Sequence, residues 1–168
     1  KNRELNRRLN ELYANAQDNE RLTVRTHQLA LALMRADGAA DTVLAMVASL
    51  GEDFAGDSVR VVLFDAIDGL AADWLQVIPL GDARLAPFRD CLTENEPICG
   101  RLNPDKMQVL FGDEQESSQS VALIPLPGVG LIAVGSRDGN RFFPGMGTLF
   151  LRLMGEVFST ALARYARG

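Results

Sequence analysis

The chain has 168 residues, 47% of them hydrophobic and 23% charged, which is typical of a globular protein with a substantial core. Its formal net charge is −5, and an acidic surface repels the phosphates of nucleic acid, so a nucleic-acid-binding role is disfavoured. No apolar run approaches the roughly 20 residues of a membrane-spanning helix, and the polar, charged first residues are unlike a secretory signal peptide.

Residues 1–35 predict one long helix, because they contain no Gly or Pro and are rich in Leu, Arg, Glu, Asn and Ala. Apolar residues recur at steps of four and three, with one slip after Asn19, which is close to a coiled-coil seam. The seam positions, which include two polar residues, are Leu5, Leu9, Leu12, Ala16, Asn19, Leu22, Thr26, Leu29 and Leu33. A single apolar stripe needs a partner, so we expect a homodimer through this helix.

The next segment predicts a helix, two strands and a turn. Asp37-Gly38 ends the first helix, and Asp41 is the expected N-cap of the second. Residues 59–64 and 74–78 have the apolar, β-branched composition of strands. Asp68-Gly69 between them is typical of a turn.

Residues 85–95 predict a short helix, and residues 97–102 a short extended piece. Asn103-Pro104-Asp105 then combines a capping side chain, a proline at the first helical position and an acid near the positive end of the helix dipole. We therefore expect a second short helix to begin there.

The last third of the chain predicts two adjacent antiparallel strands, at residues 121–127 and 131–136, and a long helix at residues 149–165. The whole order predicts an α+β fold, with a central antiparallel sheet, the terminal helices on one face and the middle connections on the other. We divide the chain into a helical dimerisation segment at residues 1–36 and a domain at residues 37–168. The apolar stripe of the C-terminal helix is expected to run beside the first helix in the dimer.

Several segments carry a resemblance to known proteins. They are NRELNRRLNELYANAQDNERL at 2–22, CGRL at 99–102, LFG at 110–112, ALIPL at 122–126 and GSRDGNRFFPGMGTLFL at 135–151. The order of elements resembles a GAF domain, and these segments resemble the uncharacterised bacterial GAF-like family called domain of unknown function 484. GAF domains are small sensory and ligand-binding modules, often dimeric and attached to helices. The resemblance implies a GAF-like sheet and a signalling role, but no ligand.

In a GAF-like domain the pocket lies between the sheet and the connections that here span residues 80–118. The resemblance therefore implies these ligand-binding candidates: Trp74, Phe88, Cys99, Arg101, Met107, Phe111 and Ser120. Arg101 is suited to hold a carboxylate or phosphate in bidentate fashion, or else it is a structural Arg paired with Asp105. The apolar candidates also suit plain core packing. The signature of cyclic-nucleotide-binding GAF domains is absent from the sequence.

The two cysteines, Cys91 and Cys99, favour a reducing, cytoplasmic compartment. Some GAF domains reduce free methionine sulfoxide with cysteines in this region, but with a third cysteine that this chain lacks. Such chemistry needs a lowered thiol pKa, which Arg101 would supply beside Cys99; buried structural thiols are the alternative reading. His27 is the only histidine, so the sequence offers no metal cluster and no Ser-His-Asp triad.

We therefore expect a non-enzymatic, ligand-binding GAF-like module without a cofactor or metal. Two alternatives remain open: a thiol redox enzyme that uses Cys99 and Cys91, and a scaffold whose vestigial pocket is filled by side chains. A bound small molecule and the state of the two thiols are the observations that separate these readings.

Overall fold

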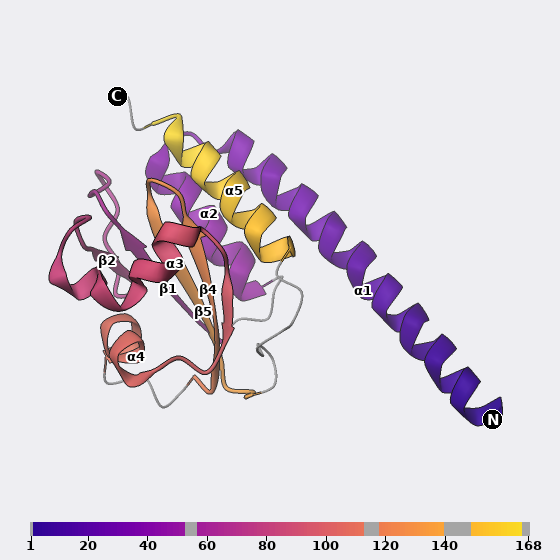
Figure 1. Cartoon of the computed structure of the whole chain (residues 1–168). Coiled ribbons are helices and arrows are strands. Elements are labelled where there is room, and N and C mark those ends of the chain that lie inside the picture. Colours follow the sequence, from indigo (N-terminus) through magenta and orange to yellow (C-terminus); the bar gives the residue numbers. More distant parts are fainter. Residues whose placement is uncertain (1, 53–56, 113–117, 140–148, 166–168) are drawn as a thin grey trace.

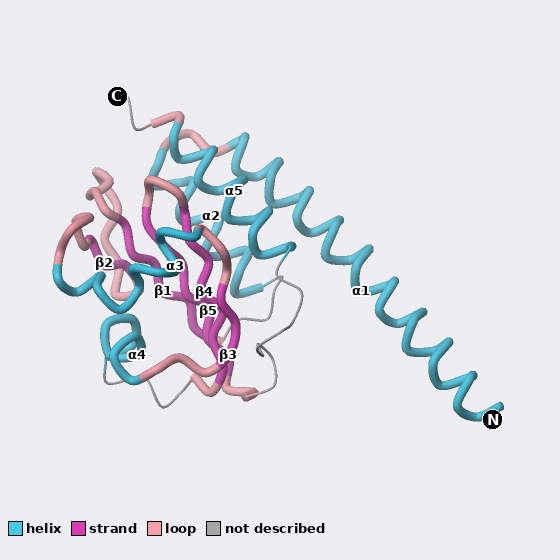
Figure 2. Tube along the Cα trace, viewed as in Figure 1, coloured by secondary structure: helices cyan, strands magenta, loops and turns pink. Residues whose placement is uncertain are grey.

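The computed structural model describes residues 2–52, 57–112, 118–139 and 149–165. It is a mixed α+β structure in which helices lie on both faces of one sheet, and one long helix projects from the body (Figure 1). The helices are α1 (Asn2–Arg35), α2 (Ala39–Glu52), η1 (Ala83–Phe88), α3 (Arg89–Glu94), α4 (Pro104–Phe111) and α5 (Leu149–Ala163). The strands are β1 (Ser58–Leu63), β2 (Leu75–Val77), β3 (Ile98–Gly100), β4 (Ser120–Leu126) and β5 (Gly130–Ser136) (Figure 2).

The strands form one five-stranded sheet in the order β2-β1-β5-β4-β3. The β4–β5 hairpin is antiparallel, as expected, with Ile124 opposite Ile132. The β1–β2 pair is parallel, so the expectation of a wholly antiparallel sheet is wrong at this edge. The turn expected at Asp68-Gly69 is present, and in it the Leu70 amide donates to the Ile67 carbonyl oxygen over 3.2 Å, but it does not join β1 and β2 as an antiparallel pair. The apolar residues of the connection, Ile67, Leu70 and Trp74, pack against the first core.

Alternate residues of the strands face two separate cores. In β1, Val61 and Leu63 face one side and Val62 faces the other, because successive strand side chains point to opposite faces. The first core joins the sheet to α1, α2 and α5, and includes Leu33, Met46, Ile124, Met154 and Phe158. The second core joins the other face to η1, α3 and α4, and includes Leu85, Phe88, Leu110, Phe111 and Leu123. The expected division of helices between the two faces is confirmed.

Helix α1 has two environments along its 34 residues. Near its C-terminal end, Leu29 and Leu33 are buried in the first core beside α2 and α5. Its N-terminal half extends away from the body as an arm (Figure 1). Despite the length of α1, no helix in the described part of the chain is both long and apolar enough to cross a membrane.

Helix α5 approaches β4 closely at a glycine. An ideal Cβ added to Gly155 would lie 2.9 Å from Ile124 Cγ2 and 3.0 Å from the Pro125 carbonyl oxygen. A larger residue would push the helix away from the strand, since packed interiors leave few voids. This close contact explains why Gly155, a residue of poor helix propensity, lies inside α5.

Two local expectations are corrected by the structure. Helix α2 begins at Ala39 and Asp41 lies inside its first turn, so Asp41 is not the N-cap; the Thr42 amide already donates to the Gly38 carbonyl oxygen over 3.0 Å. Two short helices, η1 followed by α3, take the place of the single helix expected at residues 85–95. Pro87 explains the break, because its ring and missing N–H oppose a continuous α-helix. The Asn103 cap of α4 is confirmed, with its side chain accepting from the Lys106 amide.

Candidate functional site

The aromatic and apolar candidates of the expected GAF-like pocket lie inside the second core. Phe88, Met107 and Phe111 are all buried there, together with Leu85 and Leu110. Their side chains fill the space between the sheet and the helices η1 and α4. The guanidinium of Arg60, on β1, lies 5.4 Å from the centre of the Phe111 ring. The structure therefore brings these candidates together as packing partners.

The other candidates lie elsewhere. Trp74 and Cys99 are partly buried against the first core, on the opposite face of the sheet from Phe88. Ser120 is buried, and its hydroxyl donates a 2.6 Å hydrogen bond to the Asp138 carbonyl oxygen. Arg101 is exposed, and its guanidinium donates a 2.9 Å hydrogen bond to the Gln119 side-chain oxygen rather than pairing with the expected Asp105. These residues do not gather around a common cavity with the second-core candidates.

The two thiols face different cores. Cys91 packs in the second core, whereas Cys99 on β3 pairs with Ala122 and contacts the first core. The sheet therefore separates them, and they form no disulfide. Burial raises the pKa of the Cys91 thiol from its usual 9.0 to about 11, against a smaller lowering effect of Lys106. A thiol that stays protonated at neutral pH is a poor nucleophile.

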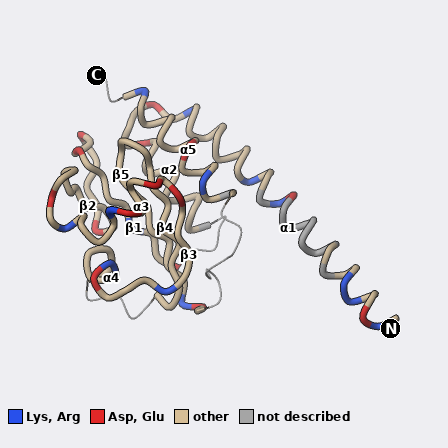
Figure 3. The backbone as a smooth tube through the Cα atoms, in the orientation of Figure 1, with Lys and Arg blue, Asp and Glu red and all other residues tan. Residues whose placement is uncertain are grey.

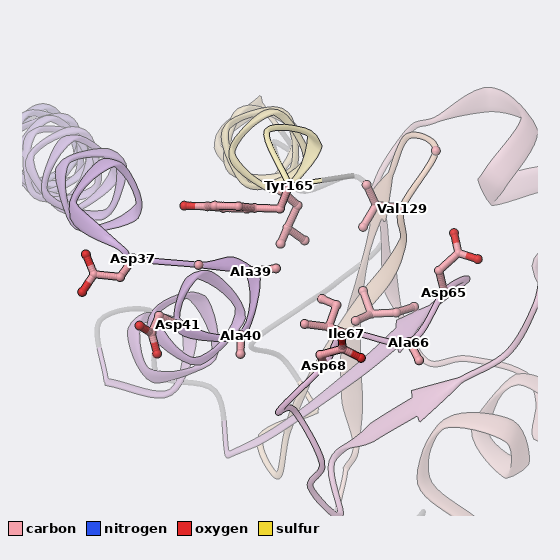
Figure 4. A pocket seen from close by; sticks show the side chains of 14 residues that line it. Asp37, Ala39, Ala40, Asp41, Asp65, Ala66, Ile67, Asp68, Val129 and Tyr165 are labelled. Atoms are coloured by element: carbon pink, nitrogen blue, oxygen red, sulfur yellow. The ribbon is translucent and has the colours of Figure 1, made fainter. Parts of the chain in front are cut away.

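A cavity of about 640 Å³ opens at one end of the molecule (Figure 4). We call it the junction cavity, since it lies where the α1–α2 turn, the start of the β1–β2 connection, the β4–β5 turn and the end of α5 meet. Its lining consists of Asp37, Gly38, Ala39, Ala40, Asp41, Leu63, Asp65, Ala66, Ile67, Asp68, Gly128, Val129, Leu162 and Tyr165. None of the expected ligand-binding candidates lines it.

Aliphatic and polar residues contribute about equally to the lining of the junction cavity. Leu63, Ile67, Val129 and Leu162 supply aliphatic surface, and the Tyr165 ring closes one side (Figure 4). The Tyr165 hydroxyl donates a 3.1 Å hydrogen bond to the carbonyl oxygen of Ala36, at the end of α1. The lining also includes four exposed aspartates: Asp37, Asp41, Asp65 and Asp68. The carboxylates of Asp37 and Asp65 point away from the cavity (Figure 4).

The cavity has room for a small molecule. Among the described residues that line it, the titratable side chains are four aspartates and Tyr165. Within the ranges that the structure describes, no group of three or more His, Cys, Asp or Glu side chains is placed to hold a metal ion.

Several residues that line this cavity have recognisable local patterns in the sequence. Asp37-Gly38 and Asp68-Gly69 indicate turns, and Tyr165 lies at the expected end of a helix. Each assignment is local, whereas the cavity exists only because these segments meet in space. Sequence spacing alone does not place residues 38 and 165 in one wall.

Comparison with known proteins identifies the family. No curated protein matches the chain. Part of one segment that carried the resemblance, residues 140–148, lies outside the described residues. The match itself nevertheless covers residues 1–167, nearly the whole sequence. The chain therefore belongs to the family described as "Protein of unknown function, DUF484".

Proposed function

We propose that this protein is a non-enzymatic, GAF-like ligand-binding module that works as a homodimer, joined through α1 as a coiled coil and assisted by α5. The arm at residues 1–36 then forms the dimerisation segment and residues 37–168 form the sensory domain, acting in the cytoplasm. The small molecule is expected in the junction cavity rather than in the filled second core.

One observation supports the proposed dimer: leucines of the predicted seam are exposed on the projecting half of α1. Leu5, Leu9 and Leu12 have exposed fractions of 57%, 62% and 65%. Full burial of a leucine side chain stabilises by about 1.5–3 kcal/mol. In a monomer these leucines stay exposed and contribute little of that free energy. Burying them against a partner surface is therefore favourable.

A second copy of the same helix is the partner that fits this stripe. The leucines follow the four-three spacing of a coiled-coil seam, and such a seam packs best against a helix with the same spacing. The exposed pair of Arg8 and Glu4, 3.1 Å apart, supports the helical state of the arm. Basic and acidic residues both lie near the tip of the arm, and both are also found over the body (Figure 3).

Light scattering on a seam variant tests the proposal. Leu9→Asp with Leu12→Asp places charges inside the seam, where burying them unpaired is costly. The wild type is expected at twice the 18.3 kDa of one chain, and the variant at the mass of a monomer.

The matched control is Asn6→Asp with Asn10→Asp, which adds the same charge to exposed arm positions off the leucine stripe. This control should stay dimeric. A monomeric wild type, or a seam variant that remains dimeric, would show that α1 does not join two copies.

The scaffold reading is favoured by one observation, namely the side chains that fill the second core. Native mass spectrometry of the protein as purified separates the two readings. A co-purifying small molecule supports a ligand-binding module, and a bare dimer supports a scaffold. The thiol redox alternative gains no support from thiols that face opposite sides of the sheet.

A further inference from the structure

We propose that the arm of each copy packs antiparallel against α1 of the other copy, along one face of α1 that extends from Leu5 to Met34. This inference rests on the proposed dimer, and adds which face joins the two copies and in which direction their helices run. It begins from a conflict within the predicted seam. Leu29 and Leu33 belong to that seam, yet both are buried in the first core of their own chain, so neither is available to a partner.

The leucines of the arm and the leucines packed on the body lie on different sides of α1. Successive residues of an α-helix are about 100° apart, which gives about 3.6 residues per turn. Leu33 follows Leu9 by about 6.7 turns, so the two side chains point about a third of a turn apart. Met34 follows Leu9 by about 6.9 turns and Leu5 by about 8.1 turns, so it lies on the same side as these leucines.

The burial of the side chains agrees with this geometry. Met34 is 62% exposed, as much as Leu9, whereas its neighbour Leu33 is only 1% exposed. Met34 therefore lies on the uncovered side of the part of α1 that packs on the body. The exposed residues Thr23 and His27 fall on the same side between the arm and Met34. The uncovered face thus runs the length of α1 and is apolar at both of its ends.

A second copy of α1 fits this face in either direction by spacing alone, because positions four and three residues apart recur along it. In a parallel pair, Leu5 faces its own counterpart. In an antiparallel pair centred between residues 19 and 20, Leu5 faces Met34 of the partner subunit and Leu9 faces Ala30 of the partner subunit. Both directions bury the arm leucines, so the charges have to decide between them.

The distribution of charge along the chain favours the antiparallel direction. Residues 1–35 contain seven basic and four acidic side chains, whereas residues 36–168 contain ten basic and eighteen acidic ones. A parallel pair places one positively charged arm against another. An antiparallel pair places each arm beside the acidic body of the other copy, where opposite net charges attract. Packed helices lie about 8–10 Å apart, which is within the range of about 8–10 Å over which exposed charges interact at physiological salt.

Disulfide formation between introduced cysteines tests the direction. Leu5→Cys with Met34→Cys in one chain is expected to give a covalent dimer on oxidation, linked between position 5 of one copy and position 34 of the other. Leu5→Cys alone is expected to give none. In an antiparallel pair the two positions 5 are about 40 Å apart, whereas the Cα atoms of a disulfide are about 4.4–6.8 Å apart. Mass spectrometry of the linked peptides separates these bonds from any bond through Cys91 or Cys99.

Single substitutions on α1 test the face. Met34→Asp should weaken the dimer by about tenfold or more in sedimentation equilibrium, because it places an unpaired charge between two helices. The matched control is Val24→Asp, since Val24 is also apolar and 54% exposed but points about a quarter of a turn away from this face. The control should leave the dimer unchanged. Equal losses in the two variants would overturn the proposed face.

The direction and the dimer itself are tested separately. A dimeric wild type, together with a Leu5→Cys variant that links position 5 to position 5, would overturn the antiparallel direction and leave the proposed dimer standing. A dimeric protein in which neither cysteine variant forms a bond through position 5 would overturn the face as well. A wild type that is monomeric by light scattering would overturn the proposed dimer and this inference with it.

Discussion

The hydroxyl of Tyr165 donates a hydrogen bond to the carbonyl oxygen of Ala36 over 3.1 Å, which joins the end of α5 to the end of α1. These residues are far apart in the sequence, and the bond closes the helical layer over the first core. The carbonyls in the last turn of a helix lack partners within the helix, so an outside donor stabilises that end. Tyr165 therefore helps to hold the C-terminal end of α1, opposite the projecting arm, against the body.

We expect Tyr165→Phe to destabilise the fold by about 0.5–1.5 kcal/mol, because it removes one hydrogen bond and keeps the ring. In a chain of this size that lowers the melting temperature by about 2–4 °C per kcal/mol. Hydrogen exchange of the Ala36 amide, which donates to Leu33, should become faster. Ser159→Ala, which removes a hydroxyl bond within α5, is the control and should leave exchange at Ala36 unchanged.

A pair of glycine substitutions tests the close packing of α5 on β4. Gly155→Ala should destabilise by about 1–2 kcal/mol, because overpacking against Ile124 and Pro125 exceeds the gain of about 1 kcal/mol in helix propensity. Gly51→Ala, in α2, should instead be neutral or stabilise by up to about 1 kcal/mol, since nothing lies within 4 Å of the added Cβ. Urea denaturation measures both. Equal effects at the two positions would mean that α5 does not sit against β4 in this way.

Burial of Cys91 predicts a pH dependence at alkaline pH. Its thiol has a pKa of about 11 in the folded state against an ordinary value of 9.0, so below pH 9.0 both states are protonated and the thiol has no effect. Between these values the unfolded chain loses the proton first, and stability falls as pH rises. Part of the alkaline loss of stability should therefore disappear in Cys91→Ala.

The measurement compares the slope of unfolding free energy against pH, since Cys91→Ala also changes the packing by a pH-independent amount. Cys99→Ala, which alters the partly buried thiol on the other face, is the control and should retain the Cys91 contribution. Identical slopes in the wild type and Cys91→Ala would show that the Cys91 thiol is not held in its protonated form.

Local signals in the sequence were sufficient for most of the elements. The Asn103-Pro104-Asp105 start of α4 and the glycine-separated strands β4 and β5 depend on neighbouring residues, and the structure confirms both. The apolar period of α1 predicted a helix, and the helix extends from Asn2 to Arg35. Such features are determined by capping, turn chemistry and hydrophobic period, all of which act within a few residues.

Long-range contacts decided the remaining features. The parallel β1–β2 pair arises because Ile67, Leu70 and Trp74 are drawn into the first core, which no local turn rule describes. The opposite placement of Cys91 and Cys99 follows from the pleat of β3 and the side of the sheet that α3 covers. The junction cavity likewise exists because Gly38, Asp68, Val129 and Tyr165 meet at one end of the fold. The sequence by itself determined most of the helices, most of the strands and the family, while the tertiary packing of distant segments decided where the cavity lies.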